Sequence, residues 1–101
     1  MHFIEAQDLA RILDYAALVN ALEVAFRGSV TVPPRHHHTV PVADGQDATL
    51  LVMPAWDSTY LGIKTATVMP ENGALGLPGV HANYQLLDRR TGAVLAVLDG
   101  V

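Results

Sequence analysis

Cysteine is absent from this chain of 101 residues, which excludes disulfide bridges, thiolate metal ligands and cysteine nucleophiles. Basic residues are scarce too: six lysines and arginines stand against ten acidic residues and leave a formal net charge of −4. No basic stripe is available to neutralise phosphates, so we expect no nucleic-acid partner. Neither GxGxxG nor the P-loop pattern occurs, so no nucleotide-binding loop is expected within the sequence.

Long apolar runs are also missing. The longest, Ala93–Leu98, is far shorter than the roughly 20 residues that a membrane-spanning helix needs. Glu5, Asp8 and Asp14 lie where a signal peptide would carry a basic start and then an unbroken apolar stretch. We therefore expect no membrane association and, by default, a cytoplasmic location.

The sequence is rich in apolar residues: 50% of its residues are hydrophobic and only 16% are charged. This composition excludes a disordered tail, and the length predicts one domain or part of one. A body of this size cannot easily hide so much apolar surface. A partner, or a further part of the protein, is expected to cover some of it.

Helical spacing is confined to the N-terminal part of the chain. A short strand is expected at His2–Ile4, and a short helix follows with Asp8 at its start. A second, longer helix begins after Asp14, whose side chain can cap it, and ends before Gly28. Its apolar residues recur at three- and four-residue steps, which predicts a face that covers a core: Leu18, Leu22, Ala25 and Phe26.

Beyond the segment Val32-Pro33-Pro34-Arg35, which forces an extended path, the apolar period falls towards two. The predicted strands are His36–Val42, Thr49–Pro54, Tyr60–Met69, Val80–Leu87 and Ala93–Leu98. The Pro70–Gly79 stretch is expected to be a loop. Short connections favour antiparallel neighbours. We therefore predict an α+β fold, with two N-terminal helices packed on a mostly antiparallel sheet of about five to six strands.

Some of the predicted strands are apolar on both sides, as in Leu50–Met53 and Val94–Leu98. Such strands occur where a second layer or another subunit covers the far face of a sheet. We therefore expect a homodimer that is built through the sheet.

Two cations are candidates for holding a carboxylate. Arg35 follows Pro33-Pro34, which stiffen the backbone, and its guanidinium can grip a carboxylate through two parallel hydrogen bonds. Lys64 is the only lysine and stands in the middle of an apolar strand, from which it can point into a cleft. The alternatives are an arginine that is merely exposed and a lysine on the wet face of the sheet.

The triplet His36-His37-His38 suggests a metal site, but alternation along a strand sends His36 and His38 to one face and His37 to the other. Ordinary polar packing is the better interpretation, and we expect no bound metal. Gly73, Gly76 and Gly79 are interpreted as turn residues of a surface loop.

Several short motifs occur in an order and spacing that resemble the opening of the ornithine cyclodeaminase/μ-crystallin family. They are Leu13-Asp14-Tyr15, Val32-Pro33-Pro34-Arg35, Leu50 to Trp56, Gly62-Ile63-Lys64, Gly76-Leu77-Pro78, Leu86-Leu87-Asp88 and Thr91-Gly92. The resemblance covers essentially the whole chain. Each motif alone is weak, and the ordered set is far more specific.

The resemblance implies a substrate-binding and dimerising α+β domain that works with a Rossmann domain holding NAD or NADP. Residues 1–101 would form an incomplete version of the first domain, and the Rossmann domain is absent from this sequence. The chain stops at Asp99-Gly100-Val101, directly after an apolar strand, which agrees with an interrupted domain. We expect no cofactor to bind this chain alone, and no turnover by it. The catalytic base is expected beyond Val101, so no catalytic residue is assigned.

Family members exchange a hydride between the cofactor and a small amino or imino acid, as cyclodeaminases, amino-acid dehydrogenases or ketimine reductases. By resemblance, Arg35 would hold the substrate carboxylate, Lys64 would lie beside it and Met53 would line the pocket. Leu51 replaces an acidic residue of ornithine-specific members, and Gly79 replaces a usual serine or threonine, so ornithine is disfavoured. The alternative is a non-catalytic module that binds a small carboxylate or only dimerises.

Overall fold

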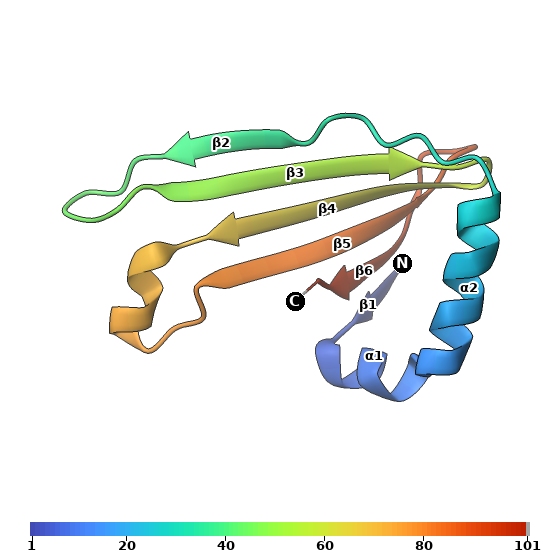
Figure 1. Cartoon of the computed structure of the whole chain (residues 1–101), viewed down its shortest axis with the longest axis horizontal. Coiled ribbons are helices and arrows are strands. Elements are labelled where there is room, and N and C mark those ends of the chain that lie inside the picture. The colour runs from blue at the N-terminus through green and yellow to red at the C-terminus, as the bar shows by residue number, and fades with distance from the viewer. Residues whose placement is uncertain (101) are drawn as a thin grey trace.

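The computed structural model describes residues 1–100 as a sheet with short helical segments at its side and end (Figure 1). The strands are β1 (His2–Ile4), β2 (His36–Val40), β3 (Ala48–Trp56), β4 (Tyr60–Val68), β5 (Val80–Asp88) and β6 (Val94–Asp99). The helices are α1 (Ala6–Ile12), α2 (Tyr15–Arg27) and the 3-10 helix η1 (Pro70–Leu75). The predicted α+β class and mostly antiparallel sheet are confirmed.

Strands β2 to β6 form an antiparallel meander, and the sheet order is β1-β6-β5-β4-β3-β2. The exception to antiparallel pairing is β1, which lies parallel to β6 with His2 opposite Ala96. The first strand therefore completes the sheet beside the last one, and both chain ends lie at the same side of the sheet (Figure 1).

Strand boundaries differ from the predicted ones where proline intervenes. β2 ends at Val40, two residues early, because Pro41 has no backbone N–H to continue the ladder. β3 runs past its predicted end at Pro54 to Trp56. The proline is tolerated because β2 pairs with β3 only as far as Val52, so Pro54 faces an open edge on that side.

The prediction of an irregular loop over Pro70–Gly79 is wrong for its first part, which forms η1. The sequence carried the signals of a helical turn: a proline in the first turn and a glycine at the end. Gly76 ends η1 in the left-handed conformation, at a φ of 71°. Its N–H donates to the carbonyl of Gly73, which closes the turn.

α2 has the ends that the sequence predicts, whereas the N-cap of α1 is Glu5. Asp8 lies in the first turn of α1 and forms an ion pair with Arg11. The carboxylate of Asp14 caps α2 by accepting a hydrogen bond from the backbone N–H of Ala16 at 3.2 Å. Gly28 is the C-cap of α2, and its N–H donates to the carbonyl of Ala25. No helix among residues 1–100 is long and apolar enough to cross a membrane.

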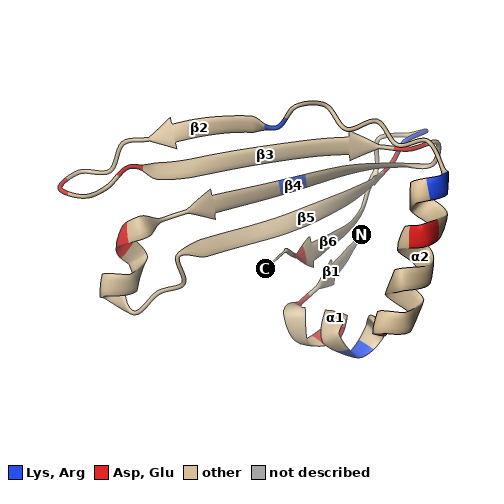
Figure 2. Ribbon diagram, in the orientation of Figure 1, with Lys and Arg blue, Asp and Glu red and all other residues tan. Residues whose placement is uncertain are grey.

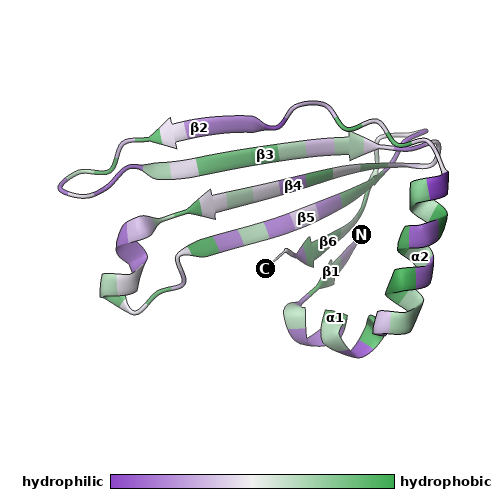
Figure 3. Ribbon diagram, viewed as in Figure 1, coloured by the Kyte–Doolittle hydropathy of each residue, from purple (hydrophilic) through white to green (hydrophobic). Residues whose placement is uncertain are grey.

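The core of this chain is small, because the only buried hydrophobic residues in the described part are Ala48, Ala66 and Ala96. α2 buries none of its residues, so it does not cover a core within this chain as predicted. Its apolar side chains stay in the open, with Tyr15 86% and Phe26 85% exposed, although its stripes of apolar and polar residues are clear (Figure 3). The radius of gyration is 15.9 Å, above the roughly 13 Å of a compact domain this long. Extensive apolar surface is thus left without a partner.

Candidate functional site

A transverse row of side chains crosses the sheet at its centre. Met53 of β3 pairs with Lys64 of β4, and Lys64 pairs in turn with Tyr84 of β5. Residues directly opposite each other on antiparallel strands project to the same face. Two of the residues named by sequence analysis, Met53 and Lys64, are therefore neighbours on one face.

Arg35 lies near this row, on the far side of β3 from Lys64. It directly precedes β2, whose first residue, His36, pairs with Val52. The ladder ends there, and the next bridge joins Thr31 to Trp56 one residue out of that register, so Arg35 lies near Met53 in the chain path without a pairing that assigns its side chain to a face. Figure 2 shows the basic position at the start of β2 and the one within β4 on either side of β3. Strands are spaced about 4.8 Å apart, so the two backbones are about 10 Å apart, which two long side chains can bridge.

Neither cation of the row is neutralised by a carboxylate of the described residues, where the single ion pair joins Arg11 to Asp8. Lys64 is half-buried, and Arg35 is exposed. A half-buried ammonium without an acidic partner favours an anion from solution. The arrangement can hold one small carboxylate over Met53.

Sequence analysis missed Tyr84. Its side chain leans diagonally across β4, and a Cβ built on Gly62 would lie 1.7 Å from the Tyr84 hydroxyl oxygen. Gly62 is two residues from Lys64 and belongs to the same face. A glycine inside a strand often marks the close approach of another group, so Gly62 carried a signal for this contact.

Tyr84 also lines a hollow of about 180 Å³ at the end of β3. The lining residues are Val30, Ala55, Trp56, Asp57, Tyr60, Gly62, Tyr84 and Leu86. Val30 reaches it because Thr31 is bonded to Trp56 in both directions, with N···O distances of 2.8 and 3.0 Å. Tyr84 is the only lining residue from the row of Lys64, so it stands at the boundary between the hollow and the row.

The positions that disfavour ornithine lie differently with respect to this row. Leu51 is two residues from Met53 on β3 and pairs with Ala66, so it shares the face of Lys64. Gly79 precedes β5, and its carbonyl accepts the N–H of Met69, five residues along the chain from Lys64. Leu51 is thus at the row, and Gly79 is roughly 16 Å away along β4.

The histidines divide between the faces as alternation predicts. His36 and His38 stack on each other, with ring centroids 6.1 Å apart, while His37 pairs with Leu51 of the other face. Over residues 1–100, no group of at least three His, Asp or Glu side chains gathers as metal ligands would. All three histidines are exposed.

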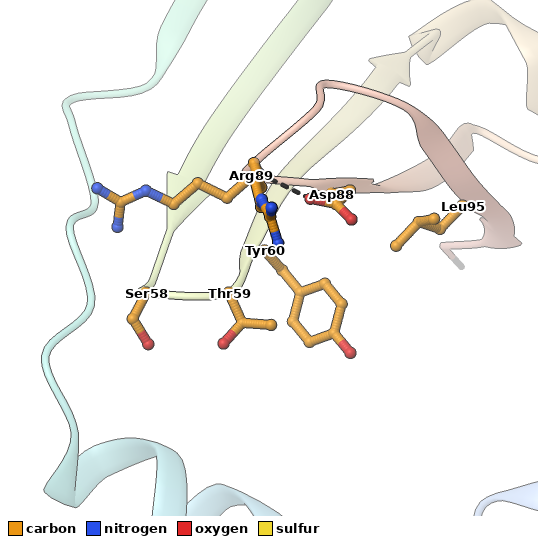
Figure 4. A pocket seen from close by; sticks show the side chains of 7 residues that line it. Ser58, Thr59, Tyr60, Asp88, Arg89 and Leu95 are labelled. Atoms are coloured by element: carbon orange, nitrogen blue, oxygen red, sulfur yellow. Dashed lines mark hydrogen bonds between the residues drawn. The ribbon is translucent and has the colours of Figure 1, made fainter.

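A second, open hollow of about 730 Å³ lies between the β3–β4 and β5–β6 turns, and Figure 4 shows the side chains that meet there. The carboxylate of Asp57 accepts the backbone N–H groups of Tyr60 at 2.7 Å and Thr59 at 2.8 Å. These bonds, and secondarily the charge of Arg89, hold the pKa of Asp57 below its usual value. Asp57 lines the hollow at the end of β3 and not this second one, and its carboxylate is occupied in shaping the β3–β4 turn between them.

The sheet, the row and the motifs converge on one protein family. The ornithine cyclodeaminase/mu-crystallin family matches residues 2–101, and the chain belongs to it. A Delta(1)-pyrroline-2-carboxylate reductase of Bacillus cereus is 36% identical over 95 residues, which cover 92% of this chain and 28% of that protein. The chain spans about a third of the length of the curated relatives it matches.

Two solved structures share the fold. The Delta(1)-pyrroline-2-carboxylate reductase of Thermococcus litoralis, in complex with NADH and L-proline, is 28% identical with a TM-score of 0.79. The match covers 100% of this chain and 32% of that one. An archaeal alanine dehydrogenase dimer with bound NAD is 29% identical, also with a TM-score of 0.79, over 98% of this chain and 31% of that one. Both of these neighbours carry a nicotinamide dinucleotide, and this chain matches about a third of each.

Proposed function

We propose that this chain is the substrate-binding part of a nicotinamide-dependent oxidoreductase that acts on a small amino or imino acid. The observation that carries the proposal is the pairing of Met53 with Lys64, with Arg35 directly before β2 and no ion pair between either cation and a carboxylate of residues 1–100. In this arrangement Arg35 and Lys64 bind the substrate carboxylate, and Met53 packs against the substrate between them.

Holding the carboxylate at two points fixes the α-carbon relative to the sheet. The α-carbon is where a nicotinamide cofactor gives or takes a hydride when it is bound. Residues 1–100 do not fit such a cofactor, because their sheet is an antiparallel meander without a glycine-rich strand-to-helix turn. The role of this chain is therefore to bind and orient the substrate.

The substrate class follows from the relatives and from Leu51. Relatives are named for pyrroline-2-carboxylate and alanine, whose side chains are small and uncharged. Leu51 lies on the face of Lys64 and offers no carboxylate to a distal ammonium group such as that of ornithine. A small cyclic imino acid or a short amino acid is the substrate that suits this face.

A homodimer is part of the proposal. β3 is apolar on both sides, with Leu50 and Val52 on one face and Leu51 and Met53 on the other. Apolar residues of α2 are exposed as well, and the archaeal alanine dehydrogenase is described as a dimer. Sedimentation at micromolar concentration should give twice the mass of one chain, and a single monomeric species would contradict this part.

The test uses the full-length protein that the gene encodes. Calorimetric titration with L-proline and L-alanine should show binding, and Arg35→Ala and Lys64→Ala should each weaken it at least about tenfold. Arg11→Ala is the matched control, because Arg11 pairs with Asp8 on α1, outside the row, and should leave binding unchanged. Equal binding by all variants would refute the site. Binding without any nicotinamide-dependent turnover would favour the non-catalytic module instead.

A further inference from the structure

Tyr84 is the residue of the row that lies between Lys64 and the hollow at the end of β3. It is directly opposite Lys64 in the register, yet its ring leans over Gly62, two residues further along β4. A diagonal neighbour of this kind is about 7–8 Å away on the sheet, within reach of an aromatic side chain. The ring thus occupies the path from the cation pair to the hollow.

From this position we infer that Tyr84 sets the upper limit to the size of the substrate side chain. The inference rests on the proposed function, because it takes Arg35 and Lys64 as the anchor of the carboxylate. A substrate anchored there extends its side chain along the sheet until it meets the tyrosine ring. Short side chains and five-membered rings stop before the ring, and longer ones collide with it.

The hollow beyond the Tyr84 ring offers space for a larger substrate side chain when Tyr84 is replaced by a smaller residue. It has about 180 Å³, and aliphatic side chains and a glycine form much of its wall, among them Val30, Ala55 and Leu86. Removing the Tyr84 side chain joins this space to the space over Lys64. An apolar pocket distinguishes ligands that differ by one methylene group by about 10- to 200-fold. Removal of the Tyr84 side chain should therefore produce a measurable change in the preference between such ligands.

The Tyr84 hydroxyl supports the same assignment. Within residues 1–100 it makes no hydrogen bond, and the side chain is half-buried. A phenol without a structural partner is not needed to tie β5 to β4, which are already joined along their whole length. The ring's contact with the strand is one of shape, so size, and not polarity, is the property that it controls.

The decisive experiment compares two ligands that differ by one methylene group, L-proline and its six-membered-ring homologue. Both are titrated calorimetrically into the wild-type protein, Tyr84→Phe and Tyr84→Ala. The wild type and Tyr84→Phe should prefer L-proline, because both keep a ring over Gly62. Tyr84→Ala should shift the ratio of the two dissociation constants at least about tenfold towards the larger ligand. A ratio that stays constant while both affinities fall together would overturn the role of Tyr84.

A second pair of variants keeps the test decisive if Tyr84→Ala fails to fold. Tyr84→Leu fills the half-buried position with a shorter apolar side chain and should shift the ratio in the same direction. Gly62→Ala places a Cβ where the Tyr84 hydroxyl lies, so it should alter the ratio in the wild type and have little effect in Tyr84→Leu. Equal effects of Gly62→Ala in both backgrounds would contradict the contact.

The two proposals fail in different ways. Wild-type protein that binds neither ring would refute the carboxylate site, and the size limit with it. The other outcome is that wild-type protein binds L-proline through Arg35 and Lys64, but substitutions at residue 84 do not change the ratio of the two dissociation constants. That outcome would refute only the size limit and not the carboxylate site.

Discussion

The Arg89 guanidinium donates a hydrogen bond of 2.6 Å to the backbone carbonyl of Asp57, which ties the β5–β6 turn to the β3–β4 turn. The backbone N–H of Arg89 adds a second tie, to the carbonyl of Thr59 at 3.1 Å. Asp57 itself orders its turn by accepting two backbone N–H groups. The two turns therefore act as one unit at this end of the sheet.

Replacing Asp57 by asparagine should lower stability at neutral pH and matter less in acid. The folded-state pKa of Asp57 lies below its usual value, mainly because its carboxylate accepts backbone N–H groups of Tyr60 and Thr59. A lowered pKa stabilises the fold above the unfolded pKa, about 3.9, and this contribution is lost as the pH falls through the folded pKa. Urea unfolding should show a constant gap between wild type and Asp57→Asn from pH 5 to 7. The gap should shrink below about pH 4.

Asp47→Asn is the control for this experiment. Asp47 is exposed and takes part in none of the hydrogen bonds of residues 1–100. Its substitution should change the urea midpoint little at neutral pH. A gap for Asp57→Asn that grows in acid would contradict the sign of the effect.

Two glycines of one segment should respond oppositely to alanine. Gly76 has a φ of 71°, and Gly73 of η1 has no positive φ, while a Cβ at either position meets nothing within 4 Å. Alanine at Gly76 should therefore cost about 1 kcal/mol of stability through backbone strain alone. Alanine at Gly73 should be neutral or slightly stabilising, since it reduces the freedom of the unfolded chain. Equal losses in thermal unfolding would show that φ is not the cause.

Removing the cap of α2 should loosen that helix. Asp14→Ala deletes the acceptor for the Ala16 N–H and should cost about 1 kcal/mol, whereas Asp14→Ser or Asp14→Asn should restore most of it. Amide hydrogen exchange of α2 is the measurement, because faster exchange confined to its first turn identifies a capping effect. Uniformly faster exchange over the whole sheet would point to another cause.

At the candidate site, Arg35→Lys should separate charge from geometry. The lysine keeps the positive charge but cannot grip a carboxylate through two parallel hydrogen bonds. Loss of one charge-assisted bond should weaken the binding of a small carboxylate about tenfold, with little change in stability, because Arg35 is exposed. Calorimetry of Arg35→Lys against Arg35→Ala measures the difference. Indistinguishable affinities of the two variants would mean that the Arg35 guanidinium does not bind the carboxylate through two parallel hydrogen bonds.

Much of the fold could be predicted because local chemistry determines it. Asp14 and Gly28 bound α2 by their capping chemistry, and the alternation of apolar residues locates the meander strands to within a few residues. The parallel contact of β1 with β6 escaped prediction, because it joins residues some ninety positions apart and no turn chemistry announces it. The exposure of α2 was not predicted either. An apolar stripe on a helix predicts that it is buried, but it does not identify the surface that buries it.

The candidate site was predictable in its residue types and not in its shape. Rigid prolines before Arg35, and a lone lysine within a strand, single out two cations from the sequence alone. The pairing of Lys64 with Met53 follows only once the strands and turns have exact lengths. The approach of Tyr84 to Gly62 depends on a side-chain rotamer that crosses from one strand to the next, which no sequence pattern specifies.

The parallel pairing of β1 with β6 has a consequence for how the chain acquires its structure. During synthesis His2 is made some ninety residues before its partner, Ala96. The meander from β2 to β5 can form progressively by neighbouring hairpins, but β1 stays unpaired until β6 has been made. Closure of the sheet is therefore a late, long-range event. Pulse-labelled hydrogen exchange during refolding should show the amides of β1 gaining protection after those of β3 and β4.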